Sequence, residues 1–213
     1  MVLYNTLVGF CAGIVIMTVA DVVRRYPVIT LPGHGVVLAV AGVPLTLLSA
    51  VATITWPLSA NPPINIAFFE PSFMLGVLAL AGAVVLLRRW EREVDQEFLS
   101  RLRPGLWLVF AIGLMLLAIS SAIFSYNLVG DAPPNEPITG QFRGWENTTF
   151  GVVYLLAAIG CLVAPKLELA NVRLVMRWSW LISGAFFLLF SILNFRTHIG
   201  LLINTLKGTS FMW

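Results

Sequence analysis

Six long apolar stretches, separated by shorter polar segments, run through the sequence. A helix that crosses a lipid bilayer needs about 20 consecutive, mostly apolar residues. The stretches that approach or exceed this length are residues 3–23, 36–59, 71–88, 105–127, 147–165 and 174–200. The pattern therefore predicts an all-α fold. We expect a polytopic membrane helical bundle of about six transmembrane helices, forming a single domain over residues 1–213.

The composition favours a membrane protein over a water-soluble one. Hydrophobic residues make up 59% of the 213 residues and charged residues only 11%, whereas a soluble domain has about 25% charged residues. The mean hydropathy is +0.91. The net charge of +3 provides no extended basic surface for nucleic acid, so the expected partners include membrane lipids and no nucleic acid.

Basic residues are distributed unevenly over the loops. Most Lys and Arg residues follow the first, third and fifth spans, whereas the loop after the second span has none and the loop after the fourth has only Arg143. Because Lys and Arg accumulate on the cytoplasmic side, both termini are predicted to be extracytoplasmic. Arg24 and Arg25 follow the first span, which favours an uncleaved helix. The expected location is the inner (plasma) membrane, as a multi-pass protein.

Two local patterns in the first span predict specific contacts. Asp21 lies one helical turn before Arg24 and Arg25, so we expect ion pairs among these side chains. Gly9-x-x-x-Gly13 places two glycines on one helical face, which favours close approach of another helix.

Residues 88–103 differ from the other loops. They contain five arginines and four acidic residues. An apolar residue recurs at every fourth position, at Trp90, Val94, Phe98 and Leu102. This spacing predicts a short interfacial helix that either extends the third span or lies at the inner lipid surface.

The loops after the second and fourth spans contain similar residues in the same order. Each loop has an aromatic residue, a double proline, an aromatic residue followed by glutamate, and a Gly-Val pair. The matching residues are Trp56 and Tyr126, Pro62-Pro63 and Pro133-Pro134, Phe69-Glu70 and Trp145-Glu146, and Gly76-Val77 and Gly151-Val152. The order predicts a parallel helical-hairpin repeat. Convergence on residue types that are common in loops is the alternative.

Glu70 and Glu146 are the first candidate site residues. Each is expected at the extracytoplasmic start of a span, where unpaired backbone N–H groups and the helix dipole favour a carboxylate. One interpretation is helix capping. The other is that the two carboxylates bind a cation, a proton or a polar ligand together.

Ionisable groups at membrane depth usually face the bundle interior, and Arg196 and His198 lie in the last span. We therefore predict a polar ligand-binding cluster on the extracytoplasmic face, with Glu136 as a further acid. Its residues are Asn65, Glu70, Glu146, Asn147, Asn194, Arg196 and His198. Glu70, Glu146 and His198 have the chemistry of a transition-metal site. A structural network of salt bridges and hydrogen bonds is the alternative.

The two histidines are expected on opposite faces of the membrane, because His34 follows the first span and His198 lies in the last. A bis-histidine haem is therefore disfavoured, a haem with one histidine ligand remains open, and no cofactor is assigned. Cys11 and Cys161 lie alone in apolar spans, so a zinc site or CxxC pair is excluded. Buried free thiols are expected, and a buried disulfide between the two is the alternative.

Several outer-loop motifs resemble those of an uncharacterised prokaryotic family of small multi-pass membrane proteins, a domain-of-unknown-function family. The motifs are Thr55-Trp56-Pro57-Leu58, Asn65-Ile66-Ala67-Phe68-Phe69-Glu70-Pro71, Glu136-Pro137-Ile138-Thr139-Gly140 and His198-Ile199-Gly200. The resemblance implies a membrane fold over nearly the whole chain. It implies no activity.

No phosphate-binding loop, dinucleotide fingerprint, GxSxG or HExxH motif is present, so no catalytic residue is predicted. We expect a non-catalytic accessory subunit of a larger membrane complex, with other membrane protein subunits as partners. The alternative is a small transporter, or a ligand- or metal-binding membrane protein, with a polar site on the extracytoplasmic face. A metal-dependent membrane enzyme built on His198 is a third hypothesis.

Overall fold

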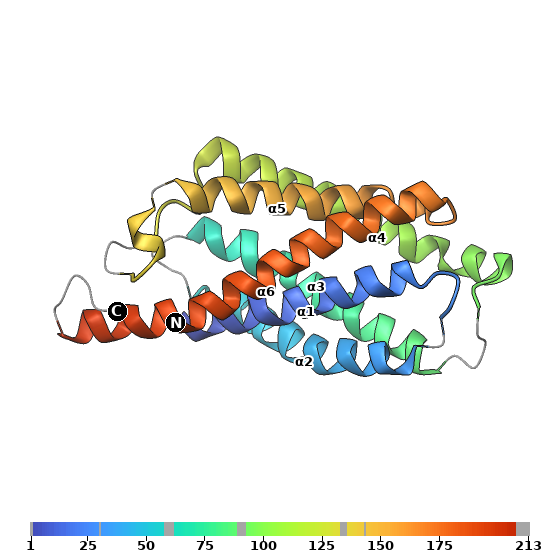
Figure 1. Cartoon of the computed structure of the whole chain (residues 1–213), viewed down its shortest axis with the longest axis horizontal. Helices are drawn as coiled ribbons and strands as arrows, with labels where there is room; N and C mark the ends of the chain where they lie inside the picture. The colour runs from blue at the N-terminus through green and yellow to red at the C-terminus, as the bar shows by residue number, and fades with distance from the viewer. Residues whose placement is uncertain are drawn as a thin grey trace.

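A computed structural model describes residues 2–29, 31–57, 62–88, 93–132, 136–142 and 144–207. These residues form six long α-helices and two short 3-10 helices (Figure 1). The elements are α1 (Val2–Arg24), α2 (Pro32–Thr55), α3 (Pro62–Arg88), α4 (Gln96–Tyr126), η1 (Thr139–Gln141), α5 (Trp145–Leu162), η2 (Ala164–Lys166) and α6 (Ala170–Lys207). All six α-helices are long and apolar enough to cross a membrane. The prediction of an all-α membrane helical bundle is confirmed.

The helices pack mainly as three pairs, which are α1 with α6, α2 with α3, and α4 with α5. The α2–α3 pair and the α4–α5 pair are helical hairpins. Helix α1 also contacts α2 and α3, and α5 also contacts α6, so the α1–α6 pair joins the two hairpins. Helices α3 and α4 follow each other along the chain but make few contacts. This sparse contact matters because it leaves space between the two hairpins.

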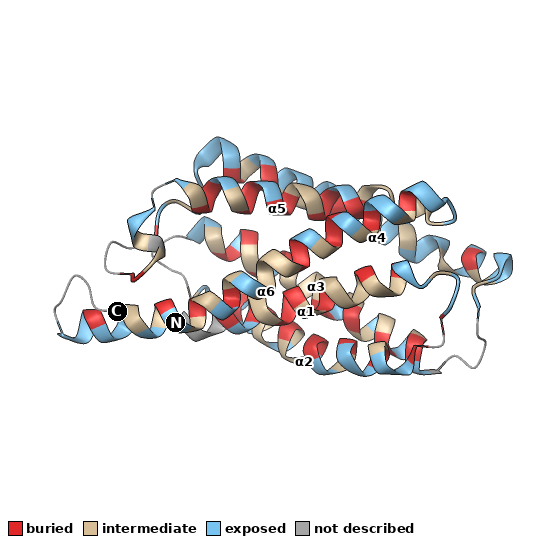
Figure 2. Ribbon diagram, viewed as in Figure 1, coloured by how far each residue is buried: buried red, intermediate tan, exposed pale blue. Residues whose placement is uncertain are grey.

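Buried residues concentrate where helices face one another, and the outward faces are exposed (Figure 2). The outward face of α2 shows this most clearly, because Val40 is 70% exposed and Ile54 is 81% exposed. Helical spacing places Val36, Val43, Leu47 and Val51 on the same face. A continuous apolar face of this kind contacts lipid in a membrane.

Glycines hold α1 and α6 together. A Cβ atom on Gly13 would lie 2.6 Å from the backbone nitrogen of Leu188, and one on Gly184 would lie 2.9 Å from the nitrogen of Met17. At Gly9 a Cβ atom would meet the hydroxyl oxygen of Ser191 at 2.4 Å. The close approach predicted from Gly9 and Gly13 is therefore confirmed, and small residues permit it.

The predicted ion pairs form at the end of α1, where the chain continues toward α2. The Nε atoms of Arg24 and Arg25 donate to the Asp21 carboxylate at 2.6 and 2.8 Å. The Nε2 atom of His34 also lies 2.8 Å from an Asp21 oxygen, a contact that the sequence pattern does not predict. Both cysteines are buried free thiols, as expected.

Two helix starts differ most from the prediction, whereas the other boundaries differ by seven residues or fewer. Helix α3 starts at Pro62 instead of residue 71, because the first turn of a helix tolerates prolines, which lack an N–H. Residues 96–103 begin α4 instead of extending α3 or forming a separate interfacial helix. Asp95 caps this start by accepting a hydrogen bond from the Phe98 N–H at 2.7 Å. Val94 and Phe98 pack against the core of the α1–α3 side, and Trp90 lies outside the described residues.

Candidate functional site

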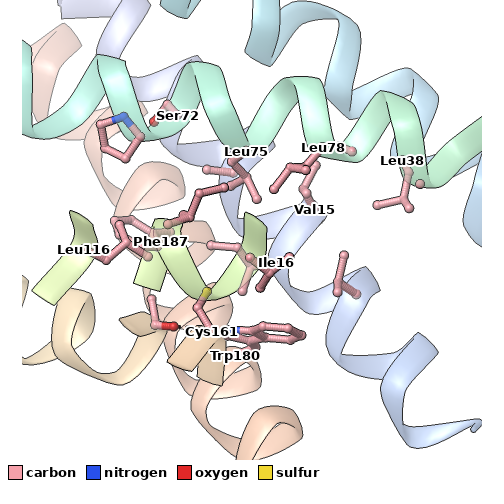
Figure 3. A pocket seen from close by; sticks show the side chains of 18 of the residues that line it. Val15, Ile16, Leu38, Ser72, Leu75, Leu78, Leu116, Cys161, Trp180 and Phe187 are labelled. Carbon is pink, nitrogen blue, oxygen red and sulfur yellow. Dashed lines mark hydrogen bonds between the residues drawn. The ribbon is translucent and has the colours of Figure 1, made fainter. Parts of the chain in front are cut away.

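A cavity of about 420 Å³ lies inside the bundle, and residues from all six α-helices line it. We call it the chamber. Figure 3 shows Val15 of α1, Leu75 and Leu78 of α3, Leu116 of α4 and Phe187 of α6 around this space. The volume lies within the range of about 300–1,000 Å³ that is typical of small-molecule sites.

The lining of the chamber extends along much of the length of α3 and α4. The lining residues on α3 run from Phe68 to Val85, and those on α4 run from Leu102 to Leu116. At 1.5 Å per residue, the α3 segment rises about 25 Å, close to the roughly 30 Å hydrocarbon thickness of a bilayer. The space is therefore long enough for an extended hydrocarbon chain.

The chamber reaches the outer surface of the bundle between α3 and α4. Ala81 of α3 and Gly105 of α4 both line the chamber and are both exposed. These two helices make few contacts with each other, and a Cβ atom on Gly105 would find no atom within 4 Å. The chamber therefore opens toward the outside of the bundle at this gap.

Nearly all the side chains around the chamber are apolar, and two of the few polar ones bond to backbone. The Tyr154 hydroxyl donates to the Ala67 carbonyl at 2.7 Å, and the Trp180 Nε1–H donates to the Ala157 carbonyl at 3.3 Å. The first bond has a clear cause in the sequence. Pro71 lacks an N–H, so it leaves the Ala67 carbonyl without its helical donor, and Tyr154 replaces that donor.

Asn194 differs from Tyr154 and Trp180. It lines the chamber, is only 4% exposed, and its amide oxygen has no hydrogen-bond partner among the described residues. Ser191, one turn away on α6, and Ser72 of α3 also line the chamber. A buried amide oxygen without a donor is costly. This oxygen has almost no accessible surface, so the chamber does not expose it to a ligand.

A second polar group lies one helical turn beyond Asn194 on the same face of α6. The Nδ1 atom of His198 is 3.1 Å from the Thr6 hydroxyl, and its Nε2 atom is 3.6 Å from the carboxylate of Glu136. Glu136 is only 4% exposed. A Cβ atom on Gly200 would lie 2.6 Å from Pro137, so the segment around Glu136 packs closely on α6.

The structure places the predicted acidic residues in different environments. Glu70 is exposed and lies in the third turn of α3, so the interpretation of Glu70 as a helix cap is wrong. Glu146 is buried in the first turn of α5, where the helix dipole favours a carboxylate. The two glutamates therefore do not occupy equivalent positions in the two hairpins.

The other predicted site residues also differ in their roles. Asn147 connects α5 to the end of α4, because its amide donates to the Ile123 carbonyl at 3.0 Å and accepts from the Val129 N–H at 3.1 Å. Asn65 is buried at 2% exposure, whereas Arg196 is exposed. Asn194 and His198 remain as neighbours on one helical face.

No metal-ligating group is formed in the part of the chain that the structure describes. Among these residues, no three His, Cys, Asp or Glu side chains lie close enough to hold a metal ion, so Glu70, Glu146 and His198 are not gathered into one site. His34 contacts Asp21 and His198 contacts Thr6, and these α1 residues are about 22 Å apart along the helix. The two imidazoles cannot ligate the same haem iron.

The family model for "protein of unknown function (DUF981)" matches residues 1–200. The chain belongs to this family. The resemblance inferred from the outer-loop motifs is therefore confirmed at the level of the family. No curated protein and no solved structure matches the chain.

In this family member, two of the outer-loop motifs meet in space. The motif that begins at Glu136 packs on the motif that begins at His198, through the Glu136–His198 pair and the contact of Pro137 with Gly200. The motif that ends at Pro71 contributes the carbonyl that Tyr154 bonds.

The sequence patterns do not predict the chamber or the roles of Tyr154 and Trp180 in its lining. A signal for Tyr154 does exist, because a proline inside a span leaves a carbonyl that requires a donor on another helix. Nothing in the spacing says which helix supplies the donor. The gap between α3 and α4 has no local signal, because it depends on how the helix pairs pack.

Proposed function

We propose that this integral membrane protein binds a lipophilic molecule with one long hydrocarbon chain, which enters the chamber from the lipid between α3 and α4. The observation that carries the proposal is the chamber itself, a cavity of about 420 Å³ lined by six α-helices and open at the α3–α4 gap. This function corresponds to the ligand-binding alternative. The site lies within the membrane, however, and not only at its extracytoplasmic face.

Binding from a bilayer differs from binding from water. A chain that leaves lipid for the chamber exchanges one apolar environment for another, so the hydrophobic effect contributes little. Affinity instead comes from close contacts with the side chains that line the chamber.

The proposed orientation puts both termini, Asn194 and His198 on the extracytoplasmic side of an inner (plasma) membrane. The bias of Lys and Arg toward the loops after α1, α3 and α5 supports this orientation. The chain of the ligand then extends from the extracytoplasmic half of the bilayer toward the cytoplasmic half.

The role of accessory subunit stays a prediction. The exposed apolar face of α2 fits a partner subunit, but it fits lipid equally well. The chamber, in contrast, is inside the bundle and is not explained by docking. A ligand-binding role therefore has the stronger support.

Mass spectrometry of the purified protein tests this function. We expect one lipophilic molecule per protein to survive extensive detergent washing. Gly82→Phe fills the chamber from α3, where a glycine Cβ would touch only Leu38 at 3.4 Å, and should abolish retention. The matched control is Gly33→Phe, because Gly33 lies outside the chamber and has no atom within 4 Å of its Cβ position. Absence of a retained molecule, or equal retention by both variants, would refute the proposal.

A further inference from the structure

We infer that the ligand of the chamber has a flat, uncharged aromatic ring at one end of its hydrocarbon chain, and that this ring packs against phenylalanines of α3 and α6. This inference rests on the proposed function and specifies the class of ligand. The observation behind it is that the aromatic side chains of the lining gather toward one end of the chamber.

Five of the six described aromatic residues that line the chamber form one group of rings. They are Phe68 of α3, Phe150 and Tyr154 of α5, and Phe187 and Phe190 of α6, and we call them the ring cluster. The ring centroid of Phe150 lies 5.2 Å from that of Phe68, 6.2 Å from that of Phe187 and 5.0 Å from that of Phe190. The sixth residue, Trp180, lies about two turns from Phe187 along α6.

The opposite end of the chamber is aliphatic. There the lining comes from the segment Leu78 to Val85 of α3 and the segment Leu102 to Ile112 of α4, and none of the lining residues in these segments is aromatic. Val85 lies about 25 Å along α3 from Phe68. The two ends therefore suit different parts of one ligand, a ring at the ring cluster and a saturated chain at the aliphatic end.

Three members of the ring cluster keep accessible surface. Phe68, Phe187 and Phe190 line the chamber and are only partly buried, whereas Phe150 and Tyr154 are buried. Figure 3 shows the Phe187 side chain among the residues around this space. A ligand in the chamber can therefore contact these three rings.

Ring contacts distinguish the chamber from the surrounding lipid. A saturated chain makes similar dispersion contacts in both places, so it gains little on entering. An aromatic ring gains edge-to-face or offset contacts with Phe68, Phe187 and Phe190, and each such pair contributes more than its buried area alone. Saturated lipid chains supply no such contacts, so the ring is the part of the ligand that the chamber selects.

A charged group on the ring does not fit the lining. Among the described residues that line the chamber, none is Asp, Glu, Lys, Arg or His. A charged group would lose its hydration there without gaining an opposite charge. The attraction of a cation to ring faces is smaller than this cost, so the ring is uncharged.

Competition in detergent-purified full-length protein tests the inference. Trp180 lines the chamber, so a brominated hexadecane bound there should quench its emission, which is isolated by subtracting the signal of the Trp180→Phe variant. Three competitors share a tetradecyl chain and end in a phenyl ring, a cyclohexyl ring or a trimethylammonium group. The two rings are similar in size, but only phenyl is flat and aromatic. We expect the phenyl competitor to bind about threefold to tenfold more tightly than the cyclohexyl competitor, the value of roughly one ring pair.

A pair of double variants tests which rings are responsible. Phe187→Leu with Phe190→Leu removes two rings that line the chamber and keeps apolar side chains, so it should remove most of the preference for phenyl. The matched control is Phe10→Leu with Phe110→Leu, because both of these rings are partly buried and neither is among the lining residues. The control should keep the preference.

The outcomes separate the two proposals. Equal affinities for the phenyl and cyclohexyl competitors in the wild-type protein would overturn the ring inference and leave chain binding intact, and this comparison requires no variant. Tighter binding of the trimethylammonium competitor than of the phenyl competitor would overturn the uncharged ring. A preference for phenyl that persists in the folded Phe187→Leu, Phe190→Leu protein would show that the ring cluster does not bind the ring. Failure of the brominated hexadecane to quench Trp180 would overturn the proposed function itself.

Discussion

The contact between α5 and α6 differs from the contact between α3 and α4, although all four helices are long and apolar. We call the region where two helices face each other their boundary. Side chains of α6 donate to carbonyls of α5, from Ser183 to Val153 at 3.2 Å and from Trp180 to Ala157 at 3.3 Å. Gly160 makes room for Trp180, because a Cβ atom there would lie 2.4 Å from its Nε1 atom. Between α3 and α4 contacts are few and the chamber opens.

This difference shows what closes a helix boundary inside a membrane. Apolar side chains alone do not distinguish a neighbouring helix from lipid, because both are apolar. Close backbone contacts at glycines and hydrogen bonds to backbone carbonyls do distinguish them. The α1–α6 and α5–α6 boundaries have such contacts or bonds and are closed. A Cβ atom on Gly105 of α4 would meet no atom within 4 Å, and the α3–α4 boundary is open. Substitutions at the closed boundaries should therefore reduce stability, whereas substitutions at the open one should alter ligand binding.

The largest expected effect is at the α1–α6 contact. Gly13→Leu would drive a side chain into backbone atoms of α6 at 2.6–2.9 Å, which cannot move aside as a flexible side chain can. We expect a loss of about 3 kcal/mol or more in the free energy of unfolding, measured by denaturation in mixed detergent micelles. Gly33→Leu is the control and should have no such effect, since its Cβ position is open. Comparable stability of both variants would show that α1 and α6 are not in close contact.

A smaller loss is expected at the Tyr154–Ala67 bond. Tyr154→Phe leaves a buried carbonyl without a donor and should cost about 1–2 kcal/mol. Pro71→Ala restores an N–H that can donate to the same carbonyl, so Tyr154→Phe should cost markedly less in that background. Equal costs in the two backgrounds, measured as a double-mutant cycle, would show that Pro71 is not the reason for the bond.

The α4–α5 boundary should show a weaker dependence on one hydroxyl. Ser120 donates to the Gly151 carbonyl at 2.8 Å, and interhelical bonds of this type contribute about 0.6 kcal/mol. Ser120→Ala should lower the free energy of unfolding by about that amount. Ser121→Ala, at the exposed neighbouring position, is the control. The prediction fails if both variants have the same stability.

The smallest effect on stability is expected at the open boundary. Gly82→Phe places its ring in a cavity and not against backbone, so the free energy of unfolding should change by less than about 0.5 kcal/mol. A large loss of stability would mean that the chamber is filled by side chains. If Gly82→Phe loses the ligand but keeps its stability, the open α3–α4 boundary serves ligand binding, whereas the closed boundaries serve stability.

The sequence predicts features that depend on local spacing or on span length. Six apolar stretches are enough to predict the six helices, and residues one turn apart are enough to predict the Asp21 ion pairs. The start of α3 is less predictable, because Pro62 and Pro63 suit both a loop and a first helical turn. Residues 96–103 have both charged and apolar positions, which suit an interfacial helix and a helix end alike.

The candidate site is predictable only in part. Asn194 and His198 stand out because they are polar residues in an apolar span, and the structure keeps them adjacent on α6. The expected connection to Glu70 is not found, since Glu70 is exposed and lies inside α3. The chamber depends on which helices pair and which do not, and hydrophobic periodicity says nothing about that choice.

Photolabelling in native membranes tests the central claim most directly. A stearyl alcohol with a diazirine in its chain would be activated by light in intact membranes, and the labelled positions would be identified by peptide mass spectrometry. Binding in the chamber predicts saturable labelling of inward residues such as Leu75, Leu116 and Phe187, which excess unlabelled alcohol should suppress. Labelling confined to outward residues such as Val40 and Leu47, with none in the chamber, would contradict it.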